Sequence, residues 1–167
     1  YRALVDFGYD GVRLEGVRFF PGLMLLGRLF DLVLPGGSMV ALVVVANTGA
    51  LAAGVLLRRL VLAEPADPRL ADRAVWLLAL FPSAFVLVWG YAEGPFLAVA
   101  IGALLALRHG RLSWVAALTL GAGLLRPTGV LLALPVLVAV WRQWHGATGR
   151  QRLGGIAAGL GRSLIHL

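Results

Sequence analysis

The sequence has no cysteine among its 167 residues and only three histidines. Without cysteine the chain forms neither a disulfide nor a thiolate metal site. His109, His145 and His166 do not have the spacing of metal ligands. The sequence therefore predicts no metal site and no certain cofactor, and a divalent metal has no support in it.

Charged residues are also scarce. They make up 14% of the chain, 60% is apolar, and the mean hydropathy is +0.88, whereas soluble domains average about 25% charged residues. This composition argues against a water-soluble domain. Lysine is absent, so the 15 basic residues are all arginines, standing mostly singly or in pairs between apolar runs. The net charge of +7 therefore indicates a lipid bilayer, and no nucleic acid, as partner.

Long apolar runs dominate what remains. Runs 39–57 and 74–92 each have 19 residues without charge, close to the roughly 20 that cross about 30 Å of hydrocarbon. Three later runs are shorter, but in lipid a helix is the structure that satisfies its own backbone amides. The sequence therefore predicts an all-α, polytopic transmembrane helix bundle with five spanning helices, over 38–60, 73–90, 93–108, 112–126 and 128–142.

The arginines predict the orientation of these spans. Nine of them flank the connections within 58–73, 108–111 and 142–152, against five in the other connections and the N-terminal segment. These three connections are therefore expected in the cytoplasm, with 143–155 as a cytoplasmic loop and 1–20 as an external one.

Two further segments complete the predicted organisation. The stretch 21–35 is short and carries Arg28 and Asp31 three residues apart, which favours an interfacial helix whose apolar face meets lipid or protein. Residues 156–167 are typical of the start of another helix. We therefore interpret 1–167 as one transmembrane domain fragment, truncated at both ends, of a multi-pass bacterial plasma-membrane protein.

Two charges stand where a membrane disfavours them. Glu93 lies between the second and third spans, and Arg126 between the fourth and fifth. A 14-residue helix covers only about 21 Å, so spans of that length are expected to end below the outer surface. An isolated charge in hydrocarbon is costly, which predicts that the two meet in a water-filled external hollow, with Tyr91 and Thr128 beside them. The alternative is that each is an ordinary interfacial charge.

Three other polar residues are candidates for the site. Asn47 is the amide within a predicted span, and either bonds a neighbouring helix or lines the cavity. Asp6 and Asp10 belong to the external segment, as general bases or as solvated carboxylates. The sequence contains neither a phosphate-binding glycine loop nor a Ser/His/Asp set.

Four stretches, taken in order, resemble the membrane mannosyltransferases related to GPI mannosyltransferase II, including their bacterial homologues, in the GT-C superfamily. They cover most of positions 1 to 130: Tyr1–Asp10, Phe19-Phe20-Pro21, Phe81-Pro82-Ser83 with Tyr91-x-Glu93-x-x-Phe96, and Leu125-Arg126-Pro127-Thr128-Gly129. The family's Tyr-Ser/Thr-Glu-Ser motif is here Tyr-Ala-Glu-Gly, so its hydroxyls are missing.

This resemblance implies a GT-C-like fold and an inverting glycosyltransferase. The enzyme would transfer mannose from a polyprenyl-phosphate donor to an extracytoplasmic glycan or glycolipid acceptor. It also implies a catalytic aspartate in the first external loop, expected just before Tyr1, so that Asp6 and Asp10 are weak stand-ins for it. Arg126 is a candidate for the donor phosphate.

Two other functions fit the same pattern. In a polytopic transporter or flippase subunit, Glu93 and Arg126 would line a permeation path. In a structural membrane assembly protein they would only stabilise packing. Acidic residues in the external segment favour the enzyme, and inverted repeats, which the sequence lacks, would favour a transporter.

Overall fold

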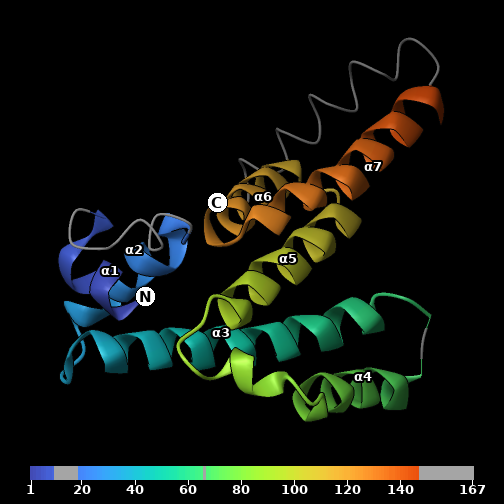
Figure 1. The fold of residues 1–167 in the computed structure, drawn as a ribbon. Helices are drawn as coiled ribbons and strands as arrows, with labels where there is room; N and C mark the ends of the chain where they lie inside the picture. The colour runs from blue at the N-terminus through green and yellow to red at the C-terminus, as the bar shows by residue number, and fades with distance from the viewer. Residues whose placement is uncertain (10–18, 66, 147–167) are drawn as a thin grey trace.

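The computed structural model describes residues 1–9, 19–65 and 67–146, and this part of the chain is mainly helical, with no strand. Figure 1 shows a long helix over Gly37–Leu62, with residues 68–87 along one side of it and the other helices on its other side. The predicted all-α class is confirmed. The elements are α1 (Arg2–Phe7), α2 (Pro21–Asp31), α3 (Gly37–Leu62), α4 (Pro68–Leu80), the 3₁₀ helix η3 (Ala84–Leu87), α5 (Glu93–Arg108), α6 (Leu112–Leu125), the 3₁₀ helix η4 (Pro127–Leu132) and α7 (Ala133–Gly146).

Helix α3 is the organising element. Its 26 residues cover about 39 Å. Among the described residues, α3 is the one helix both long and apolar enough to cross a membrane, and α6 is apolar but shorter. Helices α2, α4 and α5 all pack on it, and Ala41, Leu42, Val45 and Ala46 are buried by them.

Glycines let α5 approach α3 at backbone distance. A Cβ atom added to Gly49 of α3 would lie 2.4 Å from the nitrogen of Pro95, and one added to Gly94 of α5 would lie 2.5 Å from the carbonyl oxygen of Ala46. No side chain fits in either place. The start of α5 is therefore held against the middle of α3 by backbone contact, as small residues allow between helices.

A second close contact forms where the chain leaves α6. A Cβ added to Gly129 of η4 would lie 2.4 Å from the backbone of Ala122 and Gly123. The chain therefore folds back on the end of α6 directly after Arg126.

At the other end of α5, Arg108 forms an ion pair with Glu64 and bonds the Ala63 carbonyl at 3.5 Å. The α3–α4 and α5–α6 connections thus share one end of the molecule, as the arginine distribution predicts.

The helix predicted over 73–90 is wrong at both ends. It begins earlier, at Pro68, because the Asp67 carboxylate accepts a hydrogen bond from the Arg69 amide at 2.9 Å and caps it. It ends at Leu80, because Pro82 has no N–H and its ring would clash with a preceding helical turn. The chain then continues through η3.

The helix predicted over 128–142 is also divided. Residues 127–132 form the 3₁₀ helix η4, and α7 continues to Gly146. Pro127 at the first position favours the helical start. Residues 143–146, predicted as the start of a cytoplasmic loop, therefore belong to α7. The rest of that predicted loop and the predicted helix over 156–167 lie outside the described residues.

The interfacial helix predicted over 21–35 is shorter, ending at Asp31, and its apolar face packs on protein. Leu23 is fully buried, and Leu26 and Phe30 pack against the same hydrophobic cluster. Arg28 does not pair with Asp31: its Nε donates to the Val5 carbonyl at 2.9 Å. The predicted external loop over 1–20 contains helix α1, which this bond ties to α2.

Candidate functional site

The candidate site is built on an ion pair between two helix ends. Nη1 of Arg126 lies 2.5 Å from Oε1 of Glu93. Their side chains are 38% and 27% exposed, so the pair is neither buried nor freely solvated. The predicted meeting of these two charges, 33 residues apart in sequence, is confirmed.

Local structure explains why each charge sits where it does. Glu93 is the first residue of α5, where the positive end of the helix dipole favours a carboxylate. Arg126 follows the last residue of α6, where the negative end favours a cation. Its backbone is extended, as the residue before a proline prefers. Each charge is therefore stabilised by its own helix before the two meet.

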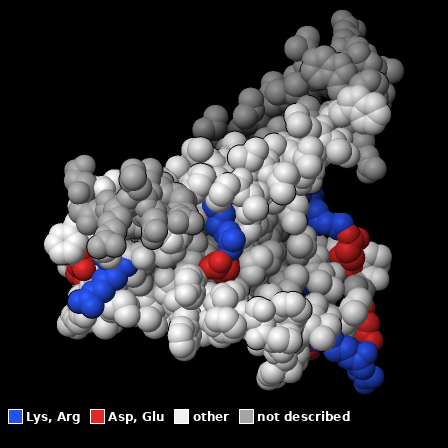
Figure 2. Space-filling model, in the orientation of Figure 1, with Lys and Arg blue, Asp and Glu red and all other residues white. Residues whose placement is uncertain are grey.

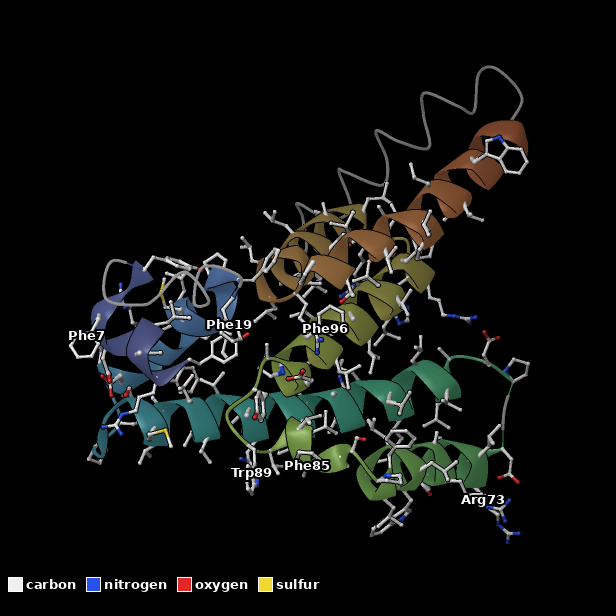
Figure 3. All side chains as sticks on the ribbon, in the orientation of Figure 1. Phe7, Phe19, Arg73, Phe85, Trp89 and Phe96 are labelled. Atoms are coloured by element: carbon white, nitrogen blue, oxygen red, sulfur yellow. The ribbon has the colours of Figure 1, made fainter. Side chains whose placement is uncertain are left out.

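An aromatic ring lies under the arginine. The guanidinium carbon of Arg126 is 5.8 Å from the ring centre of Phe96, within cation–π range. Phe96 stands three residues after Glu93 on α5, so both lie on one face of that helix. The side chains displayed in Figure 3 include Phe96 on α5. The guanidinium of Arg126 therefore contacts both the Phe96 ring and the Glu93 carboxylate.

The N-terminal segment adds Tyr1, which sequence reasoning did not select as a site residue. Burial raises the pKa of its phenol, the nearby Glu93 carboxylate raises it further, and the Arg126 guanidinium opposes them. Its ring packs against that of Phe19, with centres 4.8 Å apart. The phenol therefore stays protonated, and remains a hydrogen-bond donor, well above neutral pH. Only the packing of α1 beside the ion pair reveals this position.

The remaining predicted residues fall into different places. Tyr91 and Thr128 are exposed, next to Glu93 and Arg126 in sequence, and neither hydroxyl bonds the ion pair within the described residues. Asn47 donates from Nδ2 to the carbonyls of Val43, at 2.8 Å, and of Val88, at 3.0 Å. Its amide therefore ties the segment after η3 to α3, which is the first of its two predicted roles.

The acidic residues of the N-terminal segment do not join the pair. Asp6 pairs with Arg2 across 3.6 Å on the surface of α1, and Asp10 lies outside the described residues. No group of three or more acidic or histidine residues that could hold a metal occurs in the described part of the chain. The chemistry that this site offers is that of a positioned guanidinium.

Charge is sparse over the rest of the molecule. Figure 2 shows a broad uncharged surface interrupted by a few places where arginine and acidic side chains touch. Besides the Glu93–Arg126 pair, the ion pairs among described residues are Arg2–Asp6, Arg58–Asp72 and Arg108–Glu64.

Comparison with protein-family models, with curated proteins and with solved structures finds no significant match. The resemblance to GPI mannosyltransferase II therefore stays a prediction, and the function rests on the site itself.

Proposed function

We propose that this chain is part of a multi-pass membrane glycosyltransferase that transfers mannose from a polyprenyl-phosphate donor to an extracytoplasmic glycan or glycolipid. The observation that carries the proposal is the partly exposed Arg126 guanidinium, which contacts Glu93 and Phe96 at the ends of two apolar helices. The motif resemblance supports the sugar and the donor class.

Arg126 has N–H donors beyond the one that bonds Glu93. A guanidinium has five N–H donors, and in the described part of the chain Arg126 directs Nη1 to Glu93. The other donors match the oxygens of a phosphate in a planar, two-point arrangement that an ammonium group does not reproduce. The protonated Tyr1 phenol adds a neutral donor close by.

Helix lengths favour a site below the membrane surface. Helix α5 covers about 24 Å and α6 about 21 Å, against about 30 Å of hydrocarbon. If the arginine-rich connections lie at the cytoplasmic surface, Glu93 and Arg126 fall short of the outer surface. A phosphate at that depth meets a cation in a medium of low dielectric constant, where the attraction is strong.

The proposed reaction is a single displacement. A carboxylate base removes the proton from an acceptor hydroxyl, the hydroxyl oxygen forms a bond to the anomeric carbon, and the bond from that carbon to the phosphate oxygen breaks with inversion. The leaving phosphate takes up the electron pair, and Arg126 stabilises its charge. The base is the aspartate that the resemblance places before Tyr1, with Asp6 and Asp10 as weaker candidates.

The test measures mannose transfer from a polyprenyl-phosphate donor by the full-length protein in proteoliposomes. We expect Arg126→Lys to lower kcat/KM about 100-fold, the range seen when one transition-state donor is lost, with membrane insertion unchanged. Arg111→Lys, an equivalent change on an exposed arginine at the other end of the molecule, is the control. A wild-type rate in Arg126→Lys would remove the phosphate role. Movement of intact lipid across the bilayer without sugar transfer would assign the chain to a transporter or flippase.

A further inference from the structure

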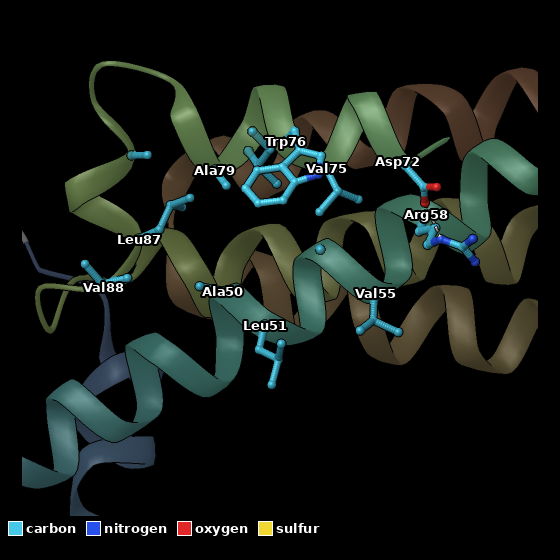
Figure 4. Close-up of a pocket in the computed structure, with 13 residues that line it drawn as sticks. Ala50, Leu51, Val55, Arg58, Asp72, Val75, Trp76, Ala79, Leu87 and Val88 are labelled. Atoms are coloured by element: carbon cyan, nitrogen blue, oxygen red, sulfur yellow. Dashed lines mark hydrogen bonds and ion pairs between the residues drawn. The ribbon is translucent and has the colours of Figure 1, made fainter. Parts of the chain in front are cut away.

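A groove runs between α3 and α4, away from the Glu93–Arg126 pair. It has a volume of about 560 Å³, and its lining residues are mainly aliphatic. Figure 4 shows Trp76 lying along it, with the Arg58–Asp72 contact at one end and Leu87 and Val88 at the other. We propose that this groove binds an acyl chain of an anionic glycerophospholipid from the cytoplasmic leaflet, and that Arg58 binds the phosphate of the same lipid.

Groove length supports a lipid of one leaflet. Along α3 the lining runs from Ala50 to Arg58, eight residue steps, or about 12 Å. Half of a hydrocarbon core of about 30 Å is about 15 Å. The groove therefore follows the second half of α3 and ends near its middle, where the Asn47 amide bonds the carbonyl of Val88, a residue of the lining.

The walls of the groove suit a hydrocarbon chain, because most of its lining residues are aliphatic. The exposed lining side chains, Leu51, Val55 and Trp76, offer it an apolar wall.

Charge at the open end of the groove favours an anionic headgroup. The α3–α4 and α5–α6 connections and the helix segments that flank them together carry six arginines (Arg58, Arg59, Arg69, Arg73, Arg108 and Arg111) against three carboxylates (Glu64, Asp67 and Asp72). In Figure 3, Arg73 projects outward from α4. Such an excess attracts anionic lipid at the cytoplasmic surface.

Arg58 is arranged to take the phosphate itself. Its Nε donates to Oδ1 of Asp72 at 2.7 Å, and both side chains are about half exposed. In the described part of the chain the two terminal nitrogens of Arg58 have no partner, so the outer edge of the guanidinium is open to a phosphate. Asp72 thus sets the direction of the fork at the mouth of the groove.

The test uses Trp76 as a reporter in the full-length protein, with every other tryptophan replaced by phenylalanine. The protein is placed in phosphatidylcholine vesicles containing a small fraction of a lipid brominated on its acyl chains, which quenches nearby tryptophan fluorescence. We expect brominated phosphatidylglycerol to quench at about fivefold lower mole fraction than brominated phosphatidylcholine, the effect of one arginine near an anionic lipid. Arg58→Gln should abolish this preference, and Arg2→Gln should keep it.

A second variant tests the groove without altering charge. A Cβ at Gly54 meets Val75 Cγ1 at an ordinary 3.6 Å, so Gly54→Leu places its branched end in the groove and should also abolish the preference. Gly121→Leu adds the same bulk where nothing lies within 4 Å and should leave the lipid preference unchanged.

Equal quenching by both lipids in the wild type would overturn the assignment. Protection from both would assign the groove to a protein segment, and stronger competition by a polyprenyl phosphate would assign it to the donor.

This inference rests on the proposed membrane placement, which is measured separately. Extraction of the protein from membranes by alkaline carbonate would contradict the proposed function as a whole. A protein that stays embedded but shows no preference for phosphatidylglycerol contradicts the lipid site alone.

Discussion

At the scale of single residues, charged side chains of opposite sign pair with one another, because an isolated charge is costly in such apolar surroundings. Glu93 and Arg126 are contributed by different helices, and each complements the dipole of its own helix before pairing. The aromatic ring of Phe96 then limits where the guanidinium can go. This arrangement makes Arg126 both a structural partner and an available cation.

The pair should show thermodynamic coupling. We expect a double-mutant cycle with Glu93→Gln and Arg126→Gln to give a coupling of about 1 kcal/mol in the free energy of unfolding. That value is at the upper end for exposed pairs, because the side chains are partly shielded. Reversible unfolding in mixed detergent micelles is the measurement. Strictly additive losses would mean that the carboxylate does not stabilise the arginine. The same cycle on the more exposed pair of Arg58 and Asp72 is the comparison.

At the scale of elements, backbone contact determines where the site is assembled. Gly49 and Gly94 bring the start of α5 onto α3, and Gly129 turns the chain back at the end of α6. Gly94 directly follows Glu93, and Gly129 stands three residues after Arg126. Other glycines, such as Gly121, face open space and have no such role.

One identical substitution at two glycines separates these cases. Gly49→Ala should lower the free energy of unfolding by about 1–3 kcal/mol, because its Cβ would overlap the backbone at Pro95 and force the helices apart. Gly121→Ala should leave stability unchanged or raise it by up to about 1 kcal/mol, since alanine favours helix and nothing lies within 4 Å. Thermal unfolding of both variants in the same detergent is the measurement. Equal effects would contradict the packing explanation.

At the scale of the whole molecule, the charges divide the helices between two ends. Arg108 and Glu64 join two connections at one end, and Arg126 and Glu93 join two others away from it. We propose that a membrane lies between these ends, with the arginine-rich connections in the cytoplasm. The groove between α3 and α4 opens toward the arginine-rich end.

The absence of cysteine makes this orientation directly measurable. We expect Thr128→Cys to react with an impermeant thiol reagent in intact cells and His109→Cys to react only after the cells are permeabilised. Both positions are exposed, and His109 avoids the left-handed backbone of Gly110 beside it. Labelling of His109→Cys from outside would reverse the proposed orientation.

The sequence by itself determined the helical class and the apolar surface, and it predicted the pairing of Glu93 with Arg126. These follow from local hydrogen bonding and from the cost of an isolated charge, which hold wherever the helices pack. Pro82 also indicates that a helix ends before it, and α4 does end at Leu80. The prediction of one helix over 73–90 was wrong because it followed the length of the apolar run.

Tertiary structure alone decided the remaining features. The place of Tyr1 beside the ion pair, the bond from Arg28 to the Val5 carbonyl and the groove between α3 and α4 all depend on how closely separate backbones approach. That approach is set by glycine contacts between residues far apart in the chain, such as Gly49 and Pro95. The pattern of residues along one helix does not predict the distance between two helices, because that distance depends on the surfaces of both.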